Sequence, residues 1–473
     1  MIKLSDENTA QRAGLGYTIS NIILKGIIFL SLPVFSRLLS PSDFGIYNNY
    51  LAYEGIISGI MSLGLYSCIK KAVFDFKDNF NSFFSSILSS IIFTYILTII
   101  LSFIFKHQIF KYTGFNEYII IILLSQSFGS AIIQLYASKL NVEFKYKEYL
   151  IISALNSITN IVLSICLIFL LSYQPWISRI IRTATPYIII GIYLVTKCYI
   201  KGRVFFKKEY VFYSLKIGLP LIPHVLSQYI LNQSDRIMIS KFIGDSESGI
   251  YSFAYNVCTI LYIVLMSIES AWTPWTYNCY ENHKNENVKK ASNRLMILSV
   301  CLFIGFVSIC PEVYKILGDE KYYPGIKMII PLSLSMFLFF LYSFPVGIEY
   351  YHKKTLFVSI ATCVAAMLNI LLNFILIPKY GYYVSAFTTL ISYVIMFLIH
   401  LAISMKFNIK QNYNLTTMGF IIFISFLYSL LLFFVEDYFV LSIIVRYGIT
   451  VLDVGFMLYF FKNDIQSLRR KMK

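Results

Sequence analysis

Charged side chains stand inside apolar stretches of this 473-residue chain. The clearest case is residues 216–251, KIGLPLIPHVLSQYILNQSDRIMISKFIGDSESGIY, where Asp235 and Arg236 lie near the end of a bilayer-length apolar run. Neighbouring positions on a helix point about 100° apart, so these two side chains need separate partners. Ionisable groups within such runs usually face a bundle interior or a water-filled path. We therefore interpret Asp235 as a candidate for coupling an ion. Arg236, about one turn from the outer end of the helix, could bind an anionic ligand or could extend to the nearby membrane surface.

Five further charges in apolar runs are candidates for the same chemistry. Lys25 lies about eleven residues into the first run, too deep to reach either membrane surface easily, and Glu54 lies at a comparable depth in the second. They could form a neutralising ion pair, or Lys25 could bind the ligand while Glu54 couples an ion. Arg179 and Arg182 share one helix face and could bind phosphate or anchor the helix. Glu269 could couple an ion or be a hydrated glutamate at the membrane boundary.

Composition places the chain among membrane proteins. Hydrophobic residues make up 58% and charged residues only 14%, against roughly 25% charged residues in an average soluble protein. The net charge of +16 belongs to loops, where it reports orientation and contact with anionic lipid, so we expect no nucleic-acid partner. The cysteines and histidines show no metal-ligand spacing, and no GxxxxGK[ST] loop occurs. We expect no metal, no cofactor and no catalytic residue.

Apolar runs predict an all-α polytopic membrane protein with about 14 transmembrane helices. The runs lie near residues 14–36, 45–66, 81–105, 115–137, 149–171, 177–199, 214–240, 249–271, 293–317, 325–349, 355–377, 382–405, 417–437 and 440–461. Lysines and arginines concentrate in alternate loops, which predicts that both termini are cytoplasmic. All loops are short, which leaves no room for a catalytic domain and predicts that the chain is not an enzyme.

An internal repeat organises these helices. Residues 36–47, SRLLSPSDFGIY, align without a gap on residues 240–251, SKFIGDSESGIY. The copies connect helices 1 and 2 and helices 7 and 8, and an even number of intervening helices keeps both halves in the same orientation. We therefore expect two parallel six-helix repeats, residues 1–200 and 201–410, followed by two additional helices and a cytoplasmic tail in residues 411–473.

Small residues, prolines and a late charge pair predict local packing. Gly55 and Gly59 are four apart and indicate close approach of another helix. Pro220 and Pro223 favour a bend at the start of the seventh helix. Arg446 and Asp453 are seven apart in the last helix, on one face, and are expected to tie that helix to its neighbour or to the main bundle.

Four motifs follow one another along the chain: SRLLSPSDFGIY, GLPLIPH, SDRIMISKFIG and IPKYGYYVSAFTTLISY. Their order resembles that of the O-antigen and polysaccharide flippases, in the multidrug/oligosaccharidyl-lipid/polysaccharide superfamily. The resemblance implies a flippase in the bacterial inner membrane that moves an undecaprenyl-pyrophosphate-linked oligosaccharide by alternating access, for O-antigen (lipopolysaccharide) or capsular polysaccharide biosynthesis. Membrane lipids, a proton or sodium gradient and a polysaccharide polymerase complex are the implied partners.

This resemblance gives the candidate residues their expected roles. Lys25, Arg236, Arg179 and Arg182 would bind the diphosphate, while Glu54, Asp235 and Glu269 would couple the ion or pair within the membrane. A cation-coupled multidrug antiporter of the same fold is the main alternative, and it would need an acidic cleft rather than a cationic one. A membrane glycan polymerase is a second alternative, which the short loops disfavour.

Overall fold

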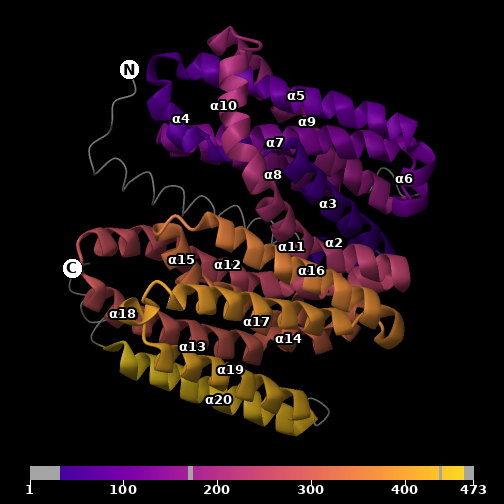
Figure 1. Ribbon diagram of the computed structural model, residues 1–473. Coiled ribbons are helices and arrows are strands. Elements are labelled where there is room, and N and C mark those ends of the chain that lie inside the picture. Colours follow the sequence, from indigo (N-terminus) through magenta and orange to yellow (C-terminus); the bar gives the residue numbers. More distant parts are fainter. Residues whose placement is uncertain (1–31, 169–173, 436–438, 463–473) are drawn as a thin grey trace. The chain divides into compact units, whose positions relative to one another are not determined.

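The computed structural model describes residues 32–168, 174–435 and 439–462 (Figure 1). Every regular element in these ranges is a helix, which confirms the predicted fold class. Ten of the described helices have the length and hydropathy needed to cross a membrane. The chain divides into two compact units, residues 1–249 and 250–473. Most of the first predicted helix, residues 14–36, lies outside the described residues.

The first unit is a bundle whose helices match the predicted apolar runs. Its longer helices are α3 (Pro41–Met61), α5 (Phe80–Ile104), α7 (Glu117–Val142), α8 (Tyr146–Ile168), α9 (Pro175–Gly202), α10 (Lys208–Gly218) and α11 (Ile222–Phe242). Shorter helices are α2 (Leu32–Leu38), α4 (Ile69–Asp75) and α6 (Lys106–Thr113). In Figure 1, α7 lies beside α9, and α3 packs against both α7 and α11.

Glycines permit the closest helix approaches in this unit. A Cβ atom added to Gly55 or Gly59 would come within 3.2 or 3.0 Å of the Tyr229 ring on α11. The predicted close packing at these two glycines is therefore confirmed, with α11 as the partner helix. Between α7 and α9 the backbones themselves meet, because a Cβ on Gly129 would lie 2.2 Å from the carbonyl oxygen of Tyr187.

The predicted seventh helix is interrupted at its first proline. Helix α10 ends at Gly218, a 3-10 turn covers Leu219–Leu221, and α11 begins at Ile222. Proline lacks the N–H that would continue the α-helical hydrogen bonds, so Pro220 accounts for the break. In Figure 1, α10 runs across the direction of α5 and α7 before the chain continues into α11. Both helices pack within the first unit, and the predicted lobe boundaries at residues 200 and 410 remain predictions.

The second unit contains the remaining helices. They are most of α12 (Asp245–Glu281), α13 (Asn285–Leu317), α14 (Ile329–Leu341), α15 (Ser343–Tyr351), α16 (Thr355–Tyr380), α17 (Val384–Met405), α18 (Ile409–Asn412), α19 (Leu415–Val435) and α20 (Phe439–Phe460). The run predicted as one helix over residues 325–349 instead comprises a 3-10 segment, Glu320–Met328, followed by α14 and α15. Hydropathy predicted the membrane span there but could not predict its division.

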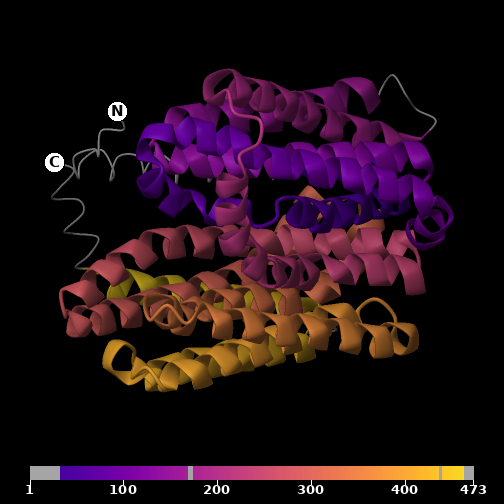
Figure 2. The ribbon, with the colours of Figure 1, turned by 45° about the horizontal axis from the view of Figure 1, so that its top comes forward.

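The last two helices, α19 and α20, lie along α13 (Figures 1 and 2). Arg446 on α20 donates from Nη1 to Glu312 Oε2 at 2.7 Å and to the carbonyl oxygen of Ser308 at 2.9 Å. About two helical turns further along α20, Asp453 lies close to Gly305 on α13. A Cβ atom added to Gly305 would be 3.7 Å from Asp453 Oδ2. The predicted tie between α20 and the main bundle is confirmed.

Candidate functional site

The two copies of the internal repeat meet at the ends of α3 and α12. A Cβ added to Gly45 would lie 1.8 Å from the carbonyl oxygen of Asp245, and one added to Gly249 would lie 1.9 Å from that of Pro41. Pro41 and Asp245 occupy equivalent positions in the aligned repeat, as do the two glycines. The contact is therefore reciprocal, with each copy presenting its glycine to the backbone of the other.

Polar side chains surround this contact within the first unit. Asn49 donates to Asp245 Oδ1 at 3.3 Å, and the Ser248 hydroxyl lies 3.1 Å from Asn49 Oδ1. The same hydroxyl lies 2.9 Å from the carbonyl oxygen of Arg236, and Ser240 donates to Asp245. The end of α11 that carries the Asp235–Arg236 pair is thus joined to the repeat contact by hydrogen bonds.

A polar cavity opens next to the same residues. It measures about 300 Å³ and is lined by Asn49, Tyr53, Tyr112, Trp176 and Asp245 among others. Lys241, at its rim, donates from Nζ to the carbonyl oxygen of Lys111 at 3.2 Å. Aromatic faces with adjoining amide and carboxylate groups make this cavity able to hold a polar organic ligand.

Arg179 and Arg182 are both buried on α9 in the first unit, and Arg179 contacts residues of α2 and α3. The Arg179 guanidinium stacks between the rings of Phe35 and Tyr47, whose centroids lie 3.7 and 3.9 Å from Cζ. Arg182 is only 1% exposed. Tyr47 and Thr183 share a hydrogen bond of 3.0 Å beside them. In this structure Arg179 has the contacts of an anchor, and its predicted role toward phosphate remains a proposal.

The Asp235–Arg236 pair is buried rather than directed to the surface. Asp235 is 1% and Arg236 5% exposed. Arg236 Nη1 donates to Gln233 Oε1 one turn earlier on α11. Burial of two adjacent charges on a spanning helix is costly unless each is supported locally, and Gln233 provides such support for the guanidinium.

Glu54 faces the interior of the same unit, from α3. Its Oε1 atom is buried, and no residue of the described ranges forms a hydrogen bond with it. Nearby, Tyr50 donates to Gln126 Oε1 at 2.8 Å, and the Ser127 hydroxyl lies 3.4 Å from the carbonyl oxygen of Glu54. Lys25, the predicted partner of Glu54, lies outside the described residues, so the proposed ion pair stays a prediction.

The structure brings most candidate residues into one unit. Glu54, Arg179, Arg182, Asp235 and Arg236 all belong to the first unit. Glu269 belongs to the second unit, on α12, where its Oε1 accepts from Thr273 at 2.6 Å.

A polar cluster that was missed from the sequence joins α16 and α17 in the second unit. Thr388 donates to Asn373 Oδ1 at 2.5 Å, and Asn373 donates to Asn369 Oδ1 at 3.2 Å. All three residues are fully buried. The sequence shows the two asparagines four apart on an apolar helix, but this spacing alone did not assign them to a site. Among the residues described, no group of three His, Cys, Asp or Glu side chains could hold a metal ion.

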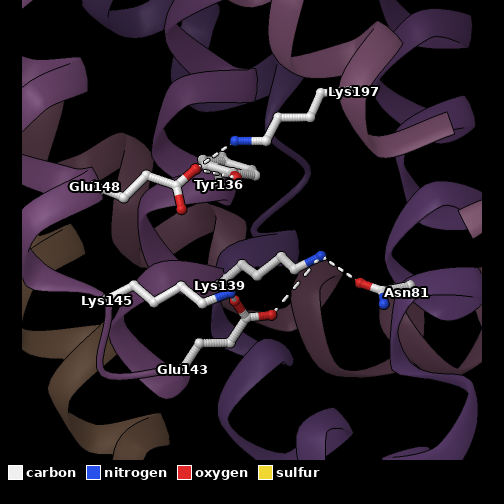
Figure 3. Close-up of polar contacts among 7 residues, drawn as sticks. All are labelled: Asn81, Tyr136, Lys139, Glu143, Lys145, Glu148 and Lys197. Carbon is white, nitrogen blue, oxygen red and sulfur yellow. Dashed lines mark hydrogen bonds and ion pairs between the residues drawn. The ribbon is translucent and has the colours of Figure 1, made fainter. Parts of the chain in front are cut away.

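A second cluster that was missed lies at the lysine-rich ends of α7, α8 and α9 (Figure 3). Glu148 accepts from Tyr136 at 2.7 Å and pairs with Lys197. Partial burial disfavours the Glu148 carboxylate, but the hydrogen bonds from Lys197 and Tyr136 outweigh it and lower the pKa of Glu148. The sequence could not reveal this pair, because Glu148 and Lys197 lie on different helices, α8 and α9.

In the same view, Lys139 points into the bundle and donates from Nζ to Asn81 Oδ1 at 2.8 Å (Figure 3). The ammonium also lies 3.9 Å from Glu143 and 4.6 Å from the centroid of the Phe84 ring. Lys139 therefore holds the ends of α5 and α7 together.

Two curated relatives resemble part of the chain. An uncharacterized membrane protein of Haemophilus influenzae is 27% identical over 254 residues, which is 50% of this chain and 62% of that protein. The Lsg locus putative protein 1 of the same organism is 22% identical over 286 residues, covering 57% of this chain and 66% of its own length. The chain thus spans slightly less than two thirds of each relative.

Two solved structures of membrane transporters share the fold of this chain. The lipid II flippase MurJ, in an inward closed conformation, superposes with a TM-score of 0.74 at 17% identity, covering 95% of this chain and 99% of that one. A multidrug resistance MATE family transporter in an outward-facing conformation superposes with a TM-score of 0.57 at 14% identity, covering 86% and 97%. Neither likeness is to an enzyme.

Family profiles match both parts of the chain. The MatE profile matches residues 220–375. The profile described as Polysaccharide biosynthesis protein matches residues 12–279, more than half of the chain, which confirms the resemblance seen in the motifs. The chain belongs to the polysaccharide biosynthesis protein family, in the superfamily that also contains the multidrug transporters.

Proposed function

We propose that this protein is a flippase that moves an undecaprenyl-pyrophosphate-linked oligosaccharide repeat unit across the bacterial inner membrane. Transport proceeds by alternating access, is driven by a proton or sodium gradient, and serves O-antigen or capsular polysaccharide biosynthesis. Membrane lipids and a polysaccharide polymerase complex are its proposed partners.

The observation that carries the proposal is the set of buried charges in the spanning helices of the first unit. Arg182 and Arg236 are 1% and 5% exposed, at positions where an apolar residue would cost nothing to bury. Guanidinium groups suit phosphate because their planar arrangement of N–H donors matches two phosphate oxygens. With Lys25 they would supply the cationic lining that a diphosphate requires, while Glu54 and Asp235 would exchange the ion.

The reciprocal contact of the repeat supports alternating access. Gly45 and Gly249 allow the starts of α3 and α12 to meet at backbone distance, and separating them would break the hydrogen bonds of Asn49 with Asp245 and Ser248. We propose that this contact closes one side of the pathway and that it opens when the cargo is released. Opening would affect Arg236 directly, because its carbonyl oxygen accepts a hydrogen bond from Ser248, which lies at the contact.

The test is transfer of a fluorescent lipid-linked oligosaccharide between the leaflets of proteoliposomes that contain the purified protein. The wild-type protein should expose the headgroup to an impermeant quencher, and Lys25→Ala should abolish that exposure without loss of folded protein. Lys379→Ala, which removes an exposed lysine, is the matched control. Normal transfer by Lys25→Ala would remove Lys25 from the mechanism. Absence of transfer by the wild-type protein under either gradient would contradict the proposed function.

The MatE profile match favours a multidrug antiporter as the second candidate. The acidic groups Glu54, Asp235 and Glu269 would then couple cation entry to drug export. Export of cationic dyes by cells that express the protein, together with no accumulation of lipid-linked oligosaccharide in a deletion strain, would favour this alternative. Accumulation of the lipid-linked unit without dye export would favour the flippase.

A further inference from the structure

A charged cavity in the second unit lies apart from every residue assigned above to transport. It measures about 300 Å³ and is bounded by α13, α14, α19 and α20. Arg446, Lys315, Glu312 and Ser442 supply its polar lining, and Ile330 and Leu432 belong to its apolar wall. Cavities that combine a few convergent polar groups with apolar walls are the usual form of a ligand site.

Arg446 has a donor left over in this cavity. Its Nη1 atom is used by Glu312 and by the carbonyl oxygen of Ser308. The residue is only 8% exposed, and its Nε atom is buried without a hydrogen-bond partner in the part of the chain that the structure describes. Enclosed in this way, Nε cannot be reached from the cavity. The second terminal nitrogen, Nη2, is not enclosed and forms no hydrogen bond among the described residues, so it is the donor that an acceptor in the cavity can reach.

The charges around the cavity favour a singly charged anion. Arg446 and Lys315 are cationic, Glu312 is anionic, and one positive charge is left over. Lys315 is exposed, 6.0 Å from the centroid of the Tyr323 ring, and its ammonium can move toward a bound anion. The Ser442 hydroxyl provides a neutral donor. A phosphodiester has one negative charge and several acceptor oxygens, which matches this set.

The apolar surroundings require that the anion carry hydrocarbon. A second cavity of about 420 Å³ lies against the opposite side of α19 and shares Ile330 with the first. Its lining is almost wholly apolar and includes Phe387, Phe426, Leu430 and Phe433. A phosphate group at Arg446 would therefore have a place for an attached acyl chain within reach along α14.

We propose that this pair of cavities binds an anionic phospholipid of the surrounding membrane. The phosphodiester accepts from Arg446 Nη2 and Ser442 and pairs with Lys315, and one acyl chain lies in the phenylalanine-lined cavity. The lipid would add a third connection between α20 and α13, beside the hydrogen bonds of Arg446 to Glu312 and to the carbonyl oxygen of Ser308. This proposal does not depend on the identity of the transported cargo, because all of its residues lie in α13, α14, α17, α19 and α20 of the second unit.

The test uses delipidated full-length protein in detergent. Phosphatidylglycerol, phosphatidylcholine and inorganic phosphate are each titrated while the thermal unfolding midpoint and the lipid retained in native mass spectra are recorded. Phosphatidylglycerol should raise the midpoint and remain bound, phosphatidylcholine should bind about fivefold more weakly because its headgroup is neutral overall, and inorganic phosphate should have no effect. An equal shift with inorganic phosphate would overturn the lipid proposal in favour of a free anion.

Lys315→Gln and Ile443→Trp test the proposal without breaking the contact between Arg446 and Glu312. Arg446→Gln should abolish binding but also removes the contact with Glu312, so it can destabilise the protein by itself. Lys315→Gln changes an exposed side chain and should weaken phosphatidylglycerol binding about fivefold. Ile443→Trp should fill the charged cavity and abolish retention of the lipid. Lys379→Gln is the control with the same change of charge. Wild-type affinity in both Lys315→Gln and Ile443→Trp would overturn the proposal.

Discussion

Glu349 and His400 form an ion pair or hydrogen bond in the interior of the second unit. Glu349 Oε1 lies 2.8 Å from His400 Nδ1, and both side chains are 0% exposed. The outer atoms of the pair, Glu349 Oε2 and His400 Nε2, are also buried, and neither has a hydrogen-bond partner among the described residues. The Tyr342 ring packs 5.5 Å from the imidazole. The pair joins α15 to α17.

Removing either partner should destabilise the second unit strongly. Glu349→Ala leaves a buried imidazole without its acceptor or counter-ion, and His400→Ala leaves a buried carboxyl, so each should cost about 3–5 kcal/mol. The double variant should cost less than the sum, because the second change removes a group that is already without a partner. Unfolding midpoints of the four proteins measure this coupling. His107→Ala, which changes an exposed histidine, is the control, and additive effects would contradict the prediction.

The reciprocal glycine contact predicts that alanine is not tolerated at either position. Gly45→Ala and Gly249→Ala each place a methyl group less than 2 Å from a carbonyl oxygen, so the helix ends must separate. We expect a destabilisation of about 1–3 kcal/mol and a change in transport rate, since the contact is proposed to close the pathway. Gly419→Ala is the matched control, because an added Cβ there meets nothing within 4 Å. Unchanged transport in both variants would separate the contact from the mechanism.

The helices of this fold could be predicted because membrane spans need long apolar runs. The run at residues 81–105 became α5, Phe80–Ile104, and the run at 382–405 became α17, Val384–Met405. Divisions within a run were not predictable in the same way. Hydropathy stays high across Tyr342, where α14 ends and α15 begins, since lipid or protein burial favours apolar side chains whichever hydrogen bonds the backbone makes.

The candidate site was only partly predictable for a related reason. Asp235 and Arg236 lie in an apolar run, but the sequence left open whether Arg236 extends to the membrane surface, and the structure buries both side chains. The neighbours of a buried side chain depend on which helices pack together, and spacing along the sequence does not show this. The stacking of Arg179 on Phe35 and Tyr47 could therefore not be predicted. The repeat is an intermediate case: its alignment was visible in the sequence, but the contact between its two copies was not.

Arg179 should behave as an anchor more than as a ligand for cargo. Its guanidinium is sandwiched between two aromatic rings, an arrangement worth about 2 kcal/mol when it is desolvated. Arg179→Gln should therefore lower the unfolding midpoint and reduce transport only in proportion to the folded protein that remains. Transport per folded molecule, measured beside Lys25→Ala, distinguishes the two roles. Complete loss of transport by a fully stable Arg179→Gln protein would instead assign Arg179 to the cargo.

The contact of Glu148 with Lys197 and Tyr136 predicts a stability that depends on pH. Because the pKa of Glu148 is lowered in the folded protein, its contribution is fully present above the ordinary glutamate pKa of about 4.3 and is lost as pH falls through the folded value. At neutral pH, Glu148→Gln should therefore cost about 1.5–3 kcal/mol, the usual effect of a hydrogen bond to a charged group. The difference in unfolding midpoint between wild type and variant should shrink below about pH 4. Glu209→Gln, which changes an exposed partner of Lys207, is the control and should leave the unfolding midpoint unchanged at every pH. If the midpoints of the wild type and Glu148→Gln differ by the same amount down to low pH, the assigned ion pair is contradicted.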